Sequence, residues 1–111
     1  ELGLKAVRGK LPSYQRLLQS FVRSHGEDAG AIETALAGNQ LEDARRLAHS
    51  LKGASATLGL TEINEVTKEL EAALRQSAPA EQTSALLARL GARLAGTSNA
   101  LNQLFSTYQA P

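Results

Sequence analysis

The chain has 111 residues, of which 42% are hydrophobic, and 12 Lys and Arg against 11 Asp and Glu leave a formal net charge of +1. This length suits one domain spanning residues 1–111, and the near-neutral balance gives no general attraction to nucleic acid or anionic lipid. Cysteine is absent, which excludes disulfides and thiolate metal sites, and no apolar stretch approaches the roughly 18 residues of a membrane span. Because the sequence starts at Glu1 and contains no Met, we expect it to be a segment of a longer polypeptide.

Leu and Ala supply most of the apolar residues, whereas there are two Phe, two Tyr and no Trp, a composition typical of helical bundles. Residues 1–10 have weak periodicity and are expected to form a short helix or an ordered arm. Pro12 is placed to open the next helix, and Gly26 to end it. Between them, one buried stripe is predicted at helical spacing: Tyr14, Leu17, Leu18, Phe21 and Val22.

A short helix is then predicted through Ile32 and Leu36 as far as Gly38. Asn39 followed by Glu42 is typical of a capping box at the start of a third helix, which Gly59 ends. The apolar positions of this third helix recur every three or four residues: Leu41, Ala44, Leu47, Leu51, Ala54 and Leu58.

Thr61 is expected to cap a fourth helix, and Ser77 and Pro79 mark a break before the last one. That last helix is long, and Gly91 and Gly96 within it are expected to weaken or kink it locally. No strand alternation and no internal repeat is present. The sequence therefore predicts an all-α protein, an antiparallel four-helix bundle with additional short N-terminal helical segments.

Most sequence signatures of catalysis are missing. Lys52-Gly53 lacks the upstream glycines of a P-loop, so there is no Gly-rich phosphate loop. Neither an HExxH motif nor a Cys/His cluster is available for zinc. We therefore expect that this domain binds no nucleotide, metal or other cofactor, and that it does not make its own phosphoryl donor.

His49 stands out because helical geometry directs it away from the core. At about 100° per residue, the apolar positions Leu47 and Leu51 lie roughly 160° from His49 on either side. The imidazole is therefore expected in the middle of a helix, facing solvent.

The helical face around His49 is suited to an attached anion. Residues within about 60° of it, or at the edge of that strip, are Arg45, Lys52, Gly53, Ala56 and Arg46. Nearby cations stabilise an anion on an imidazole. A mid-helix glycine costs about 1 kcal/mol relative to Ala, and its bare surface lets another protein approach the ring. This combination favours phosphoryl transfer between two proteins.

The run from Ala48 to Gly59, AHSLKGASATLG, resembles the AHxLKGxxxxxG signature of histidine-containing phosphotransfer domains. Residues 14–21 and 35–39 also resemble the preceding helices of that family, so the resemblance covers most of the chain. It implies a phosphorelay intermediate, not an enzyme in itself. Such a domain takes a phosphoryl group from the aspartyl phosphate of a receiver domain and passes it to another response regulator, with Mg²⁺ supplied by the receiver.

Carried onto this chain, the resemblance assigns His49 as phosphoacceptor, Lys52 as the phosphate-stabilising cation and Gly53 as the position of close approach. Docking of a receiver domain is expected to depend on the residues around the ring: Arg45, Arg46, Gly53, Ser55 and Ala56. By analogy with the family, we expect a cytoplasmic monomer, cut from the end of a hybrid sensor kinase, without contact to nucleic acid or membrane.

In this family a polar side chain on the following helix often orients the histidine. Thr67 and Glu71 are the candidates, and alignment from His49 without gaps favours Glu71. An ordinary surface charge is an equally good interpretation of Glu71. Three further glutamates are expected to form an ordinary solvated face: Glu62, Glu65 and Glu69. The other histidine, His25, is expected to interact with the last carbonyl groups of its helix.

Two alternative functions stay open. In the dimerisation domain of a histidine kinase, an acidic residue usually follows the histidine and a proline comes soon after. Here Ser50 follows His49, and the next proline is Pro79. A helical adaptor that is never phosphorylated would carry His49 incidentally, and the joint presence of His49, Lys52 and Gly53 argues against that reading.

Overall fold

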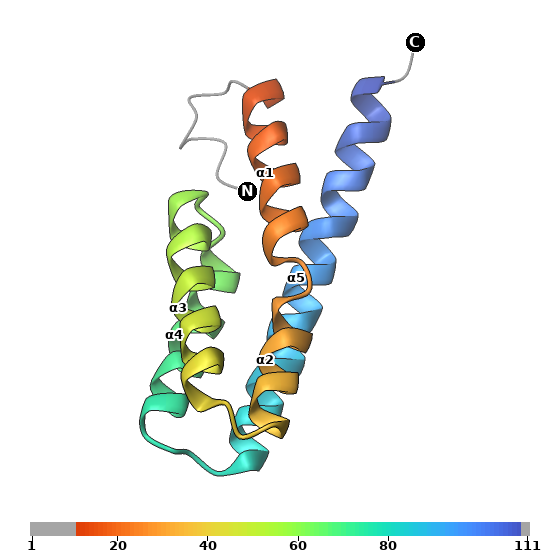
Figure 1. Cartoon of the computed structure of the whole chain (residues 1–111). Helices are drawn as coiled ribbons and strands as arrows, with labels where there is room; N and C mark the ends of the chain where they lie inside the picture. Colours follow the sequence, from red (N-terminus) through yellow and green to blue (C-terminus); the bar gives the residue numbers. More distant parts are fainter. Residues whose placement is uncertain (1–10, 110–111) are drawn as a thin grey trace.

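The computed structural model describes residues 11–109 and divides them among five helices. These are α1 (Leu11–His25), α2 (Asp28–Ala37), α3 (Leu41–Thr57), α4 (Thr61–Arg75) and α5 (Ala80–Gln109). In Figure 1, α1 and α2 run one after the other in the same direction, α3 returns, α4 reverses again and α5 runs back along the molecule. No strand occurs within residues 11–109, and the predicted antiparallel helical bundle with a short extra helix is confirmed. The helix or arm expected in residues 1–10 lies outside the described part of the chain.

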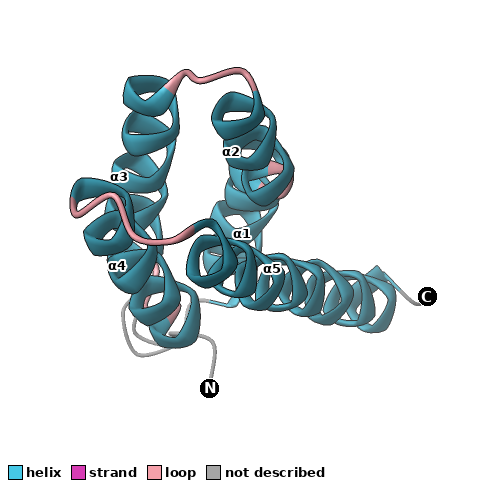
Figure 2. Cartoon of the chain, turned by 90° about the horizontal axis from the view of Figure 1, so that it is seen from below, coloured by secondary structure: helices cyan, strands magenta, loops and turns pink. Residues whose placement is uncertain are grey.

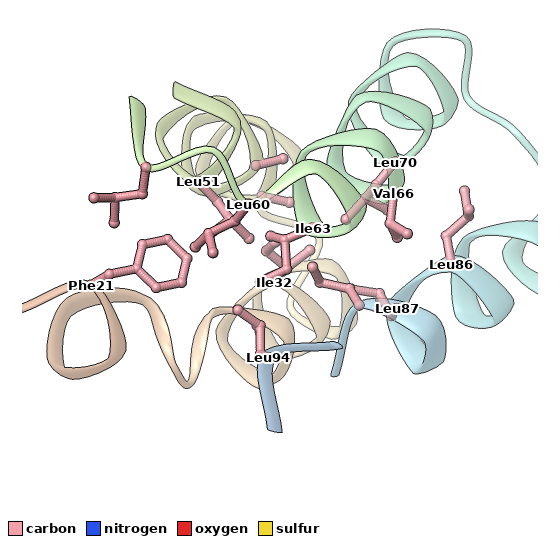
Figure 3. Close-up of a cluster of buried hydrophobic side chains, with 14 of the residues drawn as sticks. Phe21, Ile32, Leu51, Leu60, Ile63, Val66, Leu70, Leu86, Leu87 and Leu94 are labelled. Carbon is pink, nitrogen blue, oxygen red and sulfur yellow. The ribbon is translucent and has the colours of Figure 1, made fainter. Parts of the chain in front are cut away.

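The core lies between α2, α3, α4 and α5, which surround it when the molecule is viewed along the bundle (Figure 2). All five helices contribute buried apolar side chains, and those of Phe21, Ile32, Leu60, Ile63 and Leu94 face a common interior in Figure 3. Among residues 13–103, whose burial the structure describes, the buried apolar residues other than Tyr14 and Phe21 are aliphatic. Each large aliphatic side chain removed from water contributes about 1.5–3 kcal/mol, and the sum holds α3 and α4 side by side.

Three helices end in the same hydrogen-bonded turn. The residue after the helix cap has a left-handed backbone, with φ of 58° at Asn39, 72° at Gly59 and 54° at Ser77. At the end of α3, the Leu60 N–H donates to the Ser55 carbonyl at 2.9 Å, and the Gly59 N–H donates to the Ala56 carbonyl at 3.1 Å. This is the Schellman motif, which satisfies carbonyl groups left without helical partners and reverses the chain sharply.

Two predicted helix N-caps, Asn39 and Thr61, are wrong. Asn39 closes α2 instead of capping α3, and Gln40, the residue before α3, makes no side-chain cap hydrogen bond. Thr61 is the first residue of α4, and Leu60 occupies the cap position. Asn is favoured both in left-handed turns and at helix N-termini, so in a short connection its type alone does not distinguish the two.

One expectation about a helix face is also wrong. Leu17 is 46% exposed, because α1 turns Tyr14, Leu18 and Phe21 toward the core and Leu17 lies on a flank of that stripe. The last helix, α5, is continuous from Ala80 to Gln109 and includes both glycines that are expected to weaken or kink it, Gly91 and Gly96. A Cβ atom at Gly91 would lie 3.8 Å from Cβ of Ala29, so this glycine sits where α2 approaches α5.

Contacts near both ends of α1 hold it in place. The buried Tyr14 hydroxyl donates to the Leu58 carbonyl at 3.0 Å, and burial raises the pKa of Tyr14 above its ordinary value. At the other end, His25 Nδ1 lies 2.7 Å from Oδ2 of the buried Asp28, and its ring packs 5.3 Å from the Phe21 ring. His25 therefore joins α1 to α2 through a carboxylate, which corrects the expectation that it interacts with helix carbonyls.

Candidate functional site

His49 lies in the middle of α3 with its imidazole directed to solvent. Its neighbours Ala48 and Leu51 are fully buried, so the core face of the helix passes beside it. The His49 side chain is 72% exposed, as the periodicity predicts. A reagent or a protein surface can therefore reach the ring directly.

Glu71 of α4 holds the ring. Its Oε2 atom lies 2.9 Å from Nδ1 of His49, 22 residues away in the chain. Its Oε1 atom lies 2.6 Å from Nζ of Lys52, so one carboxylate binds both side chains. Glu71 is only 12% exposed, which limits the carboxylate to a narrow set of positions. The alignment from His49 thus identified the residue that contacts the ring.

Thr67, the other candidate, does not reach His49. Its side chain is fully buried, and its hydroxyl donates to the Ile63 carbonyl within α4 at 2.6 Å. The three glutamates expected on a solvated face, Glu62, Glu65 and Glu69, are exposed. Two of them also lie near cations of α5, with Glu69 3.5 Å from Arg89 and Glu62 3.6 Å from Arg93.

The hydrogen bond from Lys52 is the main reason that the pKa of Glu71 lies below its ordinary value. Partial burial acts in the opposite direction, and the hydrogen bond with His49 lowers the pKa further. The carboxylate is consequently ionised at neutral pH and can only accept hydrogen bonds. Its contact with Nδ1 therefore requires a proton on that nitrogen, which leaves the Nε2 lone pair of the neutral ring directed outward.

The surface beyond the ring is bare. Gly53 and Ala56 are exposed on α3, and a Cβ atom added at Gly53 would meet no atom of the described residues outside its own helical turn within 4 Å. The fold therefore does not require a glycine at this position, and the space beside it is open to another molecule.

Two arginines on α3 differ in how accessible they are to another molecule. Arg46 is 74% exposed and forms an ion pair with Asp43 at 2.6 Å. Arg45 is more enclosed: it pairs with Glu42 at 2.9 Å and approaches the last carbonyl groups of α4, those of Leu74 and Arg75, at 3.5 Å. A cation is stabilising at a helix C-terminus, so Arg45 contributes to the packing of α3 on α4.

Ser55 does not lie on this surface, which corrects its prediction as a docking residue. It is fully buried, and its hydroxyl donates to the Lys52 carbonyl at 3.0 Å. At about 100° per residue, Ser55 lies roughly 120° from His49 around α3, on the side that faces α4.

Asn64 of α4 contacts both Lys52 and Ser55, and the sequence pattern did not predict it. Its Nδ2 atom lies 2.9 Å from the Lys52 carbonyl oxygen and 3.4 Å from Oγ of Ser55. No motif marks this residue; only the contact between α3 and α4 brings it to the site.

Within residues 11–109 there is no group of three or more His, Cys, Asp and Glu side chains that could hold a metal ion. In the same part of the chain, no helix combines the length and apolar character needed to cross a bilayer.

A helical bundle that presents a histidine to solvent from the middle of one helix is an arrangement found in phosphotransfer modules of two-component signalling. The sequence model of the Hpt domain matches residues 16–106, and the chain belongs to this family. The crystal structure of the HPT domain from a sensor hybrid histidine kinase of Shewanella is similar to it, with a TM-score of 0.79 and 26% sequence identity over 96% of this chain and 92% of that chain. A comparison with curated proteins gives no match.

Proposed function

We propose that His49 accepts a phosphoryl group from the aspartyl phosphate of a receiver domain and passes it to a second response regulator. The observation that carries this proposal is the contact between His49 Nδ1 and the Glu71 carboxylate at 2.9 Å on an otherwise exposed ring. It prepares Nε2, the outward nitrogen, as the nucleophile.

In the proposed transfer, the Nε2 lone pair attacks the phosphorus atom while the bond between phosphorus and the aspartyl oxygen breaks. The leaving group is the aspartate carboxylate of the receiver. No proton has to leave His49, because the neutral ring carries its proton on Nδ1 and attacks through the unprotonated nitrogen. The domain therefore needs no general base, and its contribution is an oriented nucleophile.

Bonding to phosphorus leaves the imidazole ring positively charged, since Nδ1 keeps its proton. Glu71 lies against that nitrogen and stabilises the developing charge, in the manner of the carboxylate of a catalytic triad. Lys52 balances the charge of Glu71 and lies one turn along α3 from His49, where it is also placed to stabilise phosphoryl oxygens.

The receiver is proposed to dock over Gly53 and Ala56, with Arg46 at the edge of the contact. The open space beside Gly53 supports this placement, because a partner surface fits there without displacing any side chain of the domain. Mg²⁺ at the aspartyl phosphate would come from the receiver. The domain acts as a phosphocarrier, and turnover belongs to the proteins that load and unload it.

The test is phosphoryl transfer from a panel of phosphorylated receiver domains in the presence of Mg²⁺. The chain has two histidines, which provides a matched pair of variants, His49→Gln and His25→Gln. We expect an acid-labile, alkali-stable label on the wild type and on His25→Gln, and none on His49→Gln. Circular dichroism of His49→Gln should match the wild type, because the side chain is exposed.

Label on His49→Gln, or its loss only from His25→Gln, would overturn the assignment of His49. A folded wild-type protein that no receiver labels would instead support the alternative of a helical adaptor without phosphorylation.

A further inference from the structure

The backbone carbonyl of Lys52 accepts two side-chain hydrogen bonds. One comes from Ser55 Oγ at 3.0 Å, within α3, and the other from Asn64 Nδ2 at 2.9 Å, across from α4. A carbonyl oxygen accepts and does not donate, so the amide nitrogen of Asn64 must face it. Asn64 is thus a polar tie from α4 to a backbone group of α3.

The tie lies beside Gly53, the glycine within α3. The peptide whose carbonyl it binds joins Lys52 to Gly53, and glycine has more backbone freedom than any other residue. Because Gly53 has no side chain, this position makes no side-chain contact that would hold the backbone in place. A hydrogen bond from α4 restricts the backbone at this point without covering the outer face of the helix.

Asn64 and Glu71 act on the same stretch of α3 from one side of α4. Their positions lie about 20° apart around the helix axis, two turns from each other. Asn64 binds the backbone at Lys52, and Glu71 binds the side chains of Lys52 and His49. The two contacts together define how far α3 can slide along α4 before Glu71 loses either partner.

We propose that Asn64 is a positioning residue for phosphoryl transfer: it fixes the α3 backbone at Lys52 so that Glu71 reaches His49 and Lys52 together. This inference rests on the proposed role of His49 as phosphoacceptor. Removing the tie leaves the reacting groups in place but lets the Lys52–Gly53 peptide move, which broadens the distribution of His49 ring orientations. Reactions that depend on orientation are sensitive to displacements of about 1 Å.

The test compares Asn64→Ala and Asn64→Asp with Tyr14→Phe. Tyr14 is a matched control because its hydroxyl also donates to a backbone carbonyl at the end of α3, that of Leu58, away from the ring. Urea unfolding would show how much stability each variant loses. The ¹⁵N chemical shifts of the His49 ring would give the fraction of the tautomer protonated at Nδ1. Single-turnover transfer from a phosphorylated receiver would be measured at saturating domain concentration.

We expect Asn64→Ala to lower the fraction protonated at Nδ1 and to slow transfer at saturation on the order of tenfold, as for other residues that orient a reacting side chain. Asn64→Asp should be slower still, because its carboxylate cannot donate and repels the carbonyl oxygen. Tyr14→Phe should lose comparable stability with a transfer rate within about twofold of the wild type.

Asn64 variants that keep both the wild-type tautomer fraction and the wild-type rate would overturn the proposal. An equal slowing in Tyr14→Phe would also overturn it, because general loosening would then explain the effect. The tautomer measurement needs no receiver. If no receiver labels the wild type, the proposed function fails. A lower fraction protonated at Nδ1 in Asn64→Ala, without a change in Tyr14→Phe, would still support the positioning contact.

Discussion

The Lys52 ammonium lies 2.6 Å from the Glu71 carboxylate, closer than Glu71 lies to the His49 ring. The two opposite charges are only partly exposed, at 31% for Lys52 and 12% for Glu71. In the unphosphorylated domain Lys52 is therefore already engaged. In the proposed transfer, this ion pair would keep an ionised carboxylate from presenting an uncompensated negative charge to the incoming phosphoryl group.

Lys52→Ala should slow phosphoryl transfer on the order of tenfold, because it removes a cation near the phosphoryl group and leaves Glu71 without its counter-charge. In a Glu71→Gln background the same substitution should cost a smaller factor, since only the first of these effects remains. Single-turnover rates for the four proteins of this double-mutant cycle measure the coupling. Equal factors in the two backgrounds would show that Lys52 acts independently of Glu71.

The stability of the domain should fall in acid partly through Glu71. Its folded-state pKa is lowered, chiefly by the hydrogen bond from Lys52, so the unfolded chain binds a proton at this residue more readily than the folded one. The stabilisation is fully present above the ordinary glutamate pKa of about 4.3 and is lost as the pH falls through the lower pKa of the folded state. Unfolding free energies of wild type and Glu71→Gln should converge over that range, and curves that stay parallel down to about pH 3 would contradict the assignment.

Substitution of Gly53 should separate folding from docking. Gly53→Ala should raise the free energy of unfolding by about 1 kcal/mol, because alanine favours the helix and its Cβ meets nothing within the domain. Gly53→Leu should remain folded but obstruct the receiver, and raise the apparent dissociation constant for the receiver more than Gly53→Ala does. Titration calorimetry with a receiver domain and thermal unfolding of both variants provide the comparison. Normal receiver binding by Gly53→Leu would place the docking surface elsewhere.

Ser77 carries backbone strain that glycine would relieve. Its φ of 54° lies in the left-handed region, which costs a non-glycine residue about 1–2 kcal/mol. Ser77→Gly should therefore stabilise the domain by about 0.5–1 kcal/mol, after the greater entropy of glycine in the unfolded chain is allowed for. Ser84→Gly on the exposed face of α5 is the matched control and should destabilise it. Thermal unfolding that shows the same sign for both changes would argue against strain at Ser77.

Helical periodicity was sufficient to predict the fold and the exposure of His49. The core side of α3 is marked by Ala44 and Leu51, both fully buried, and the remaining geometry follows from about 100° per residue. Periodicity was weaker where adjacent residues are both apolar. It placed both Leu17 and Leu18 in the buried stripe, whereas the direction from which the other helices approach α1 leaves Leu17 exposed.

The site was predicted in part, and the limits have physical causes. His49, Lys52 and Gly53 lie on one helix, so their common face follows from spacing alone. Ser55 was predicted on the docking surface together with Ala56, but the next residue on a helix points about 100° away, and Ser55 is buried. The contact of Asn64 with the Lys52 carbonyl could not be predicted, since it depends on the register between α3 and α4, and no local pattern specifies that register.

The open space beside Gly53 means that selection for folding and selection for partner binding favour different residues at this position. A screen that rewards folding alone should discard this glycine, because alanine gives a more stable helix at no cost inside the domain. Only a screen that requires another protein to bind should retain it. Position 53 therefore offers an evolutionary readout: in a lineage whose domain no longer met its partners, we expect this residue to drift before those of the core.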